Sequence, residues 1–223
     1  MTMGQFKTWH IIAILLLVCA GFKAQAVELK QQGTSIEDIV PDGWLHQEKW
    51  GDLNKDGITD LVVVATPDYK ENTLTRDDGY VYNFNQPILA IYFGNGQVQQ
   101  LWKQYDNVIP ANESENCSHD ITLEITPRGT LRIAISLFCS AGSYGTSTDT
   151  YTYRYQHGDF CLIGMDNEEM RRNTGENTVV SENYLTWKRQ VKKSNVFDET
   201  VPSTEKWTRL PKKPLEKLGA REL

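Results

Sequence analysis

The sequence predicts an all-β protein, either an antiparallel β-sandwich or a propeller-like domain. Turn residues repeatedly separate short runs of β-branched and aromatic residues, one such run is continuously apolar, and no segment after residue 26 has a long helical period. The roughly two hundred residues that remain are enough for one domain with a full core. We therefore expect a single β-rich domain over residues 27–223, with a C-terminal surface extension from about residue 207.

The first 26 residues are typical of a signal peptide. Lys7 precedes the apolar run 11–18, which is too short to span a bilayer permanently. Ala24-Gln25-Ala26 matches the small-x-small pattern that signal peptidase cleaves. A lipoprotein with Cys19 at its N-terminus is disfavoured, because Val18 stands where a lipobox needs a small residue. The sequence therefore predicts a periplasmic or secreted protein without a permanent membrane span.

The charge of the chain excludes one class of partner. The formal net charge is −6, and removal of residues 1–26 takes away two lysines and no acid, which leaves −8. A nucleic-acid-binding protein would instead carry a basic patch. An acidic exported protein can attract cationic partners at a distance, and many lysozymes are cationic.

The segment 52–60 has the spacing of a calcium-binding loop. Oxygen-bearing side chains recur at every second position, a glycine follows, and a further carboxylate comes three residues later. We expect Ca²⁺ in a structural role, because every candidate ligand is a hard oxygen and no Cys or His lies in the loop. The predicted ligands are Asp52, Asn54, Asp56, the carbonyl of Ile58, and Asp60, with Gly57 allowing the turn.

The elements around this loop favour strands over the helices of an EF-hand. An EF-hand needs a bidentate glutamate at position twelve, where this chain has Val63. The run 61–65 is β-branched and continuously apolar, which predicts a strand buried on both faces. The loop is therefore closer to the interstrand calcium loops of FG-GAP or VCBS type. The alternative is a polar Asp-Gly turn without metal.

Turn residues predict three β-hairpins. Each pair of predicted strands flanks a strong turn signal. The pairs are 89–93 with 98–102 around Asn95-Gly96, 121–126 with 130–137 around Pro127-Arg128-Gly129, and 151–155 with 160–163 around His157-Gly158.

The second hairpin predicts a disulfide. With a three-residue loop at 127–129, opposed residue numbers add up to 256, so Cys117 faces Cys139. Facing cysteines are candidates for a disulfide in an oxidising compartment. Cys161 is then left as an odd thiol. It could instead pair with one of the other two, or all three could be reduced and buried.

The segment 140–148 follows Cys139 and predicts a projecting loop. It is rich in small residues and carries one tyrosine. Such a loop can enter the cleft of a partner, with tyrosine as a rigid contact. An ordinary flexible connector has the same composition. The candidate partner-binding residues are Ser140, Gly142, Ser143 and Tyr144.

Taken together, these segments resemble a family of exported bacterial proteins related to the periplasmic inhibitor of invertebrate-type lysozymes. This family includes immunity proteins against type IV secreted peptidoglycan hydrolases, and its members are often labelled VCBS or FG-GAP-like. The matching segments are GDLNKDGITDLVVV, SAGSYGTS with YTYRYQHGDFCLIG, NTGENTVVSENYLTWKRQ and KWTRLPKKPL.

The resemblance implies a β-rich fold with bound calcium and blockade of a muramidase by a loop. Such inhibitors carry a Ser-Gly-x-x-Tyr motif whose serine and tyrosine enter the enzyme. The nearest match here is the segment 140–144, in which an alanine separates serine from glycine and the tyrosine follows the glycine by two residues.

Three classes of function follow. The first is a non-enzymatic binding protein, an inhibitor or immunity factor against a lysozyme-like hydrolase. The second is a structural or adhesion-type envelope module, for which the polar segment 67–86 is the candidate surface. The third is an enzyme, and the sequence argues against it because no nucleophile, base and orienting residue occur together in a known motif. Adjacent acids such as Asp77-Asp78 or Glu168-Glu169 are the only hint of a glycosidase.

Overall fold

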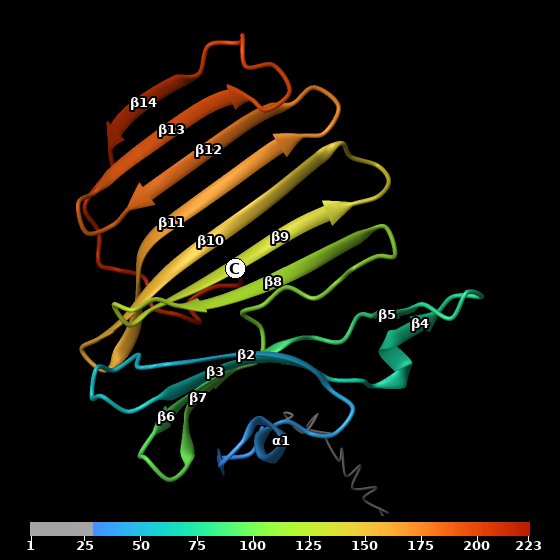
Figure 1. Cartoon of the computed structure of the whole chain (residues 1–223), viewed down its shortest axis with the longest axis vertical. Helices are drawn as coiled ribbons and strands as arrows, with labels where there is room; N and C mark the ends of the chain where they lie inside the picture. The colour runs from blue at the N-terminus through green and yellow to red at the C-terminus, as the bar shows by residue number, and fades with distance from the viewer. Residues whose placement is uncertain (1–28) are drawn as a thin grey trace, which may run out of the picture.

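The structure, a computed structural model, describes residues 29–223 and consists mainly of two antiparallel sheets (Figure 1). The smaller sheet has the spatial order β1-β7-β6-β3-β2. Its strands are β1 (Gln32–Gly33), β2 (Leu45–Gly51), β3 (Asp60–Thr66), β6 (Ile88–Gly94) and β7 (Gln99–Tyr105). The fold class is therefore all-β, as predicted.

The larger sheet follows chain order, so each strand pairs with the next one along the chain. Its strands are β8 (Cys117–Ile125), β9 (Thr130–Cys139), β10 (Gly145–Gln156), β11 (Asp159–Arg171), β12 (Glu176–Asn183), β13 (Lys188–Asn195) and β14 (Thr204–Arg209). Between β3 and β6, a 3₁₀ turn (Lys70–Asn72) leads into a small hairpin of β4 (Thr73–Thr75) and β5 (Val81–Asn83). This hairpin projects from the body of the molecule (Figure 1).

The two sheets pack against each other through a shared apolar core. The smaller sheet contributes side chains such as Val62 and Ile91, and the larger sheet contributes side chains such as Ile133 and Tyr153. These residues are at most 1% exposed. Removal of this apolar surface from water stabilises the packing of one sheet on the other.

The second face of the smaller sheet is covered by the N-terminal part of the described chain. The short helix α1 (Ile36–Ile39) begins after Ser35, whose hydroxyl accepts a hydrogen bond from the Asp38 N–H at 3.3 Å. Its apolar side chains pack on β3 and β6. The run 61–65 is consequently buried on both faces, which confirms the prediction for this strand. Within residues 29–223, no helix is long and apolar enough to cross a membrane.

All three predicted hairpins are present. The turn between β6 and β7 contains Gly96 at φ +87°, and the turn between β10 and β11 contains His157 and Gly158 at φ +53° and +77°. In the second hairpin, Ile125 pairs with Leu131 and the register continues unbroken to Cys117 and Cys139. The opposed numbers add up to 256, as predicted.

Two predicted boundaries differ from the structure. The projecting loop ends at Tyr144, because β10 begins at Gly145 and the next three residues pair with both β9 and β11. The chain from residue 207 is not simply a surface extension. It begins within β14, and Leu218 is 2% exposed in the core, where its N–H donates to the Phe160 carbonyl at 2.9 Å.

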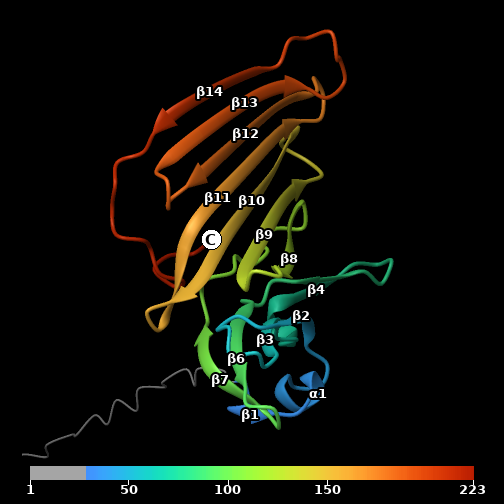
Figure 2. The same cartoon turned by 60° about the vertical axis from the view of Figure 1, so that its left-hand side comes forward.

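The larger sheet extends beyond the smaller one. In both views, β12–β14 lie away from the smaller sheet (Figures 1 and 2). Along β10, the side chains that face the core change from the buried Tyr153 and Tyr151 to Asp149 and Ser147. At this polar end the inner face forms an open groove of about 940 Å³, lined by residues of β9–β14 and the loops that connect them.

Candidate functional site

The loop 52–60 between β2 and β3 is closed by hydrogen bonds from its own backbone. The Asp52 carboxylate accepts from the N–H groups of Lys55 at 2.6 Å and Gly57 at 3.0 Å. The Asn54 and Asp56 side chains each accept from the N–H two residues further on, at 3.0 and 2.8 Å. Gly57 has φ +87°, a conformation that glycine adopts without strain.

Asp60 is the buried anchor of this loop. Asp60 is fully buried, and its Oδ2 accepts from the N–H groups of Leu53 at 2.8 Å and Asn54 at 3.3 Å. Oδ1 accepts from the N–H of Gly94 at 3.0 Å, which ties the loop to the end of β6. Burial raises the pKa of the Asp60 carboxyl, while the three N–H donors act in the opposite direction.

Some of the oxygen atoms of the loop 52–60 are suitable ligands for a hard cation. Asp52, Asn54 and Asp56 provide carboxylate and amide oxygens at one short loop, and backbone N–H groups orient them. The oxygens of Asp60 are directed at three backbone donors, as both oxygens of Asp52 are at two, and the second Asp56 oxygen accepts from the Asn54 side-chain amide at 2.9 Å. Among residues 29–223, no group of three or more His, Cys, Asp or Glu side chains is arranged to hold a metal ion.

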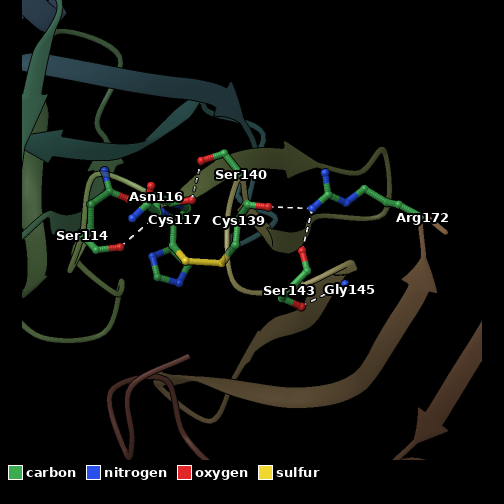
Figure 3. The surroundings of a disulfide bond; sticks show 10 residues. Ser114, Asn116, Cys117, Cys139, Ser140, Ser143, Gly145 and Arg172 are labelled. Atoms are coloured by element: carbon green, nitrogen blue, oxygen red, sulfur yellow. Dashed lines mark hydrogen bonds between the residues drawn. A yellow bond between two sulfur atoms is a disulfide. The ribbon is translucent and has the colours of Figure 1, made fainter.

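The loops 52–60 and 140–144 lie at opposite ends of β9. At the first end, where β9 begins, the turn at Gly129 approaches the loop 52–60 closely. A Cβ added to Gly129 would lie 2.7 Å from the Asp52 carbonyl oxygen. At the second end, Cys139 forms the predicted disulfide with Cys117 (Figure 3). Cys161 is free and buried. The two sets of predicted site residues are therefore about the length of β9 apart.

The base of the loop 140–144 is held from both sides. The Ser140 N–H donates to the Asn116 carbonyl at 2.7 Å, beside the disulfide. On the other side, Arg172 Nη2 donates to the carbonyls of Cys139 at 2.6 Å and Ser143 at 2.8 Å (Figure 3). The Arg172 N–H also donates to the Tyr144 carbonyl at 2.9 Å. The guanidinium lies 4.5 Å from the centre of the Phe138 ring, a cation–π contact.

The turn 172–175, which carries Arg172, is hydrogen-bonded to the end of β13 and the segment after it. The Asn195 side chain donates to the Thr174 carbonyl at 2.9 Å, and the Val196 N–H donates to the Gly175 carbonyl at 2.8 Å. The Phe197 ring lies against Gly175, where an added Cβ would come within 2.6 Å of it. The segments 140–144, 172–175 and 196–203 thus form one connected end of the larger sheet, which we call the loop edge.

The predicted partner-binding residues have different roles within the loop edge. The Ser140 hydroxyl donates to the Asn116 carbonyl at 3.3 Å, and the Ser143 hydroxyl accepts from the Gly145 N–H at 2.9 Å. Both serines therefore help to shape the loop. Gly142 has φ +81° and no neighbour within 4 Å of an added Cβ. Tyr144 is 67% exposed, which leaves its ring available for contact.

Two further residues of the loop edge were not predicted from the sequence. Phe197 is 65% exposed and lies against Gly175, and Arg172 fixes the backbone of the loop 140–144. An exposed phenylalanine in a polar segment was a usable signal for the first. The sequence carries no local signal for Arg172, because its partners lie about thirty residues earlier in the chain.

Replacement of Asp60 by Asn is expected to destabilise the fold. The amide nitrogen of Asn cannot accept a hydrogen bond, so at least one buried N–H of Leu53, Asn54 or Gly94 loses its acceptor. We expect the free energy of unfolding to fall by about 2 to 4 kcal/mol, measured by urea denaturation in the presence of a chelator. The matched variant Asp56→Asn keeps an acceptor oxygen at an exposed position and should change stability by less than about 1 kcal/mol. Equal effects of the two substitutions would contradict the anchoring role.

Comparison with known proteins found no matching family model, and no curated protein or solved structure with significant similarity to the chain.

Proposed function

We propose that this protein is an exported, non-enzymatic binding protein that inhibits a lysozyme-like peptidoglycan hydrolase, as an inhibitor or immunity factor. The observation that carries the proposal is the position of Tyr144. Its ring is exposed on a loop whose base is fixed by the Cys117–Cys139 disulfide and by three hydrogen bonds from Arg172. An aromatic side chain on a rigid loop is a typical anchor in a protein interface.

The loop edge supports this role in a second way. Rigid loops lose little conformational entropy on binding, so more of the contact energy is available for affinity. Tyr144 and Phe197 are large apolar side chains that remain exposed at this end of the sheet. The acidic net charge, −8 once residues 1–26 are removed, also favours approach to a cationic enzyme.

The loop 52–60 takes Ca²⁺ in this proposal. Asp52, Asn54, Asp56 and the Ile58 carbonyl supply the oxygens, and Asp60 either completes the set or holds the loop in place. A bound cation would neutralise the clustered carboxylates and stabilise the β2–β3 connection. Because this loop contacts the turn at Gly129, calcium would also stabilise the start of β9.

Replacement of Tyr144 by Ala tests the proposed interface. We expect the purified protein to inhibit at least one member of a panel of lysozymes, and Tyr144→Ala to weaken that inhibition by about 30-fold. Arg172→Ala should weaken it as well, because the loop loses the two side-chain hydrogen bonds to the carbonyls of Cys139 and Ser143. The readout is the inhibition constant for hydrolysis of peptidoglycan.

The matched control is Tyr80→Ala, which removes another exposed tyrosine, 59% exposed, from the connection between β4 and β5. This variant should inhibit as the wild type does. A failure to bind or inhibit any lysozyme would contradict the proposal. A loss of inhibition in Tyr80→Ala but not in Tyr144→Ala would place the contact surface at the segment 67–86 and contradict the role of Tyr144.

Calcium addition tests the metal site separately. We expect Ca²⁺ to raise the melting temperature of the chelator-treated protein. At a free Ca²⁺ concentration of a hundred times the dissociation constant, the free energy of unfolding should rise by about 2.7 kcal/mol. Asp56→Asn should weaken this response, because it removes one negative charge from the ligand set, while the turn itself remains, since Asn keeps an acceptor for the Ile58 N–H. An unchanged melting temperature in the wild type would contradict the metal site and show that the loop is a hydrogen-bonded turn.

A further inference from the structure

The outer edge of β14 is unpaired. The strand order of the larger sheet ends at β14, and no described strand lies on its other side (Figure 1). All six residues of the strand are exposed, and Trp207 is 57% exposed. An exposed strand edge presents a row of free N–H and C=O groups that can pair with another strand.

This edge is short, and three of its six residues are charged, as in many protected edges, but two other protective features are missing from it. The register between β13 and β14 contains no bulge, and the strand itself contains no proline. Pro202 and Pro211 lie outside its two ends. The opposite edge of the larger sheet is different, because β8 contacts β2 of the smaller sheet.

The backbone groups that point outward can be identified from the hydrogen bonds on the inner side. The Leu210 N–H donates to the Trp187 carbonyl at 2.8 Å, so the polar groups of Leu210 point toward β13. In an antiparallel sheet the direction alternates from one residue to the next. The N–H and C=O groups of Glu205, Trp207 and Arg209 therefore point outward, and their side chains share one face of the sheet.

We propose that two copies of the chain associate through their β14 strands, antiparallel about a two-fold axis at Trp207. In this register Trp207 faces its own copy, and Glu205 faces Arg209 of the second copy at both ends. All three pairs use backbone groups that point outward, so they form hydrogen-bonded pairs. Opposed aromatic rings and opposite charges both stabilise an antiparallel strand pair.

The other symmetric registers are less favourable. Because outward residues must pair with outward residues, the two-fold axis must pass through a residue. Axes at Glu205, Lys206 and Arg209 place like charges directly opposite each other. An axis at Thr208 places Glu205 opposite Pro211, which has no N–H to donate. An axis at Thr204 would place 205–209 opposite 199–203, which lie outside β14. The strand is thus self-complementary in charge and hydrogen bonding at one register, the one at Trp207.

The association goes beyond the proposed inhibitory function and is compatible with it. The side chains on the opposite face place Lys206 against Thr208 of the second copy, without like-charge contact. Because the two strands run in opposite directions, the loop edges of the two copies lie at opposite ends of the joined sheet. The interface involves only one short strand per copy, so we expect a concentration-dependent equilibrium.

Sedimentation equilibrium of the purified protein over a range of concentrations tests the association. We expect a monomer–dimer equilibrium. Glu205→Arg and Arg209→Glu should each weaken it by about tenfold or more, since each replaces two attractive pairs by two repulsive ones. The double variant should restore it. The control is Asp77→Arg, a charge reversal on the β4–β5 connection, which should leave the equilibrium unchanged.

Cross-linking tests the register. Hydrogen-bonded antiparallel pairs have a Cα–Cα distance of about 5.5 Å, which suits a disulfide. Trp207→Cys should therefore give a disulfide-linked dimer on mild oxidation, whereas Glu205→Cys alone should not and Glu205→Cys with Arg209→Cys should. A monomer at all concentrations, or a dimer that does not respond to the charge reversals, would overturn the proposal.

Discussion

The smaller sheet covers only part of the inner face of the larger sheet, and most features of the molecule follow from this constraint. Where the two sheets meet, the strands carry apolar side chains that share one core. Where the larger sheet continues alone, the same face carries Ser147 and Asp149, and the strands β12–β14 have few buried residues. Such strands cannot be stabilised by burial, so they depend on backbone pairing and on the connections between them.

The two ends of β9 have different roles. One end meets the loop 52–60, where Asp60 joins three backbone N–H groups and the turn at Gly129 packs against Asp52. The other end carries the disulfide and the loop that Arg172 holds. The first end fixes the strand within the core, and the second holds Tyr144 outside it. A partner would thus meet a loop supported by the whole strand.

Much of this arrangement could be predicted because it depends on local pairing. The turn at 127–129 sets the register, and the register alone places Cys117 opposite Cys139. The apolar run 61–65 revealed a strand buried on both faces. The lengths of β10 and β11 were underestimated, since their outer halves are polar and resemble loops. Leu218 was also missed, because two prolines nearby suggested a surface tail and its place in the core comes from pairing with β11.

Binding of a partner through Tyr144 depends most on the rigidity of the loop edge before that partner is bound. Amide hydrogen exchange of the free protein measures this directly. The account predicts slow exchange at the N–H groups of Ser140, Gly145 and Arg172, comparable with the neighbouring strands, and faster exchange at all three after reduction of the disulfide. Exchange at the rate of an unfolded peptide in the oxidised protein would contradict it.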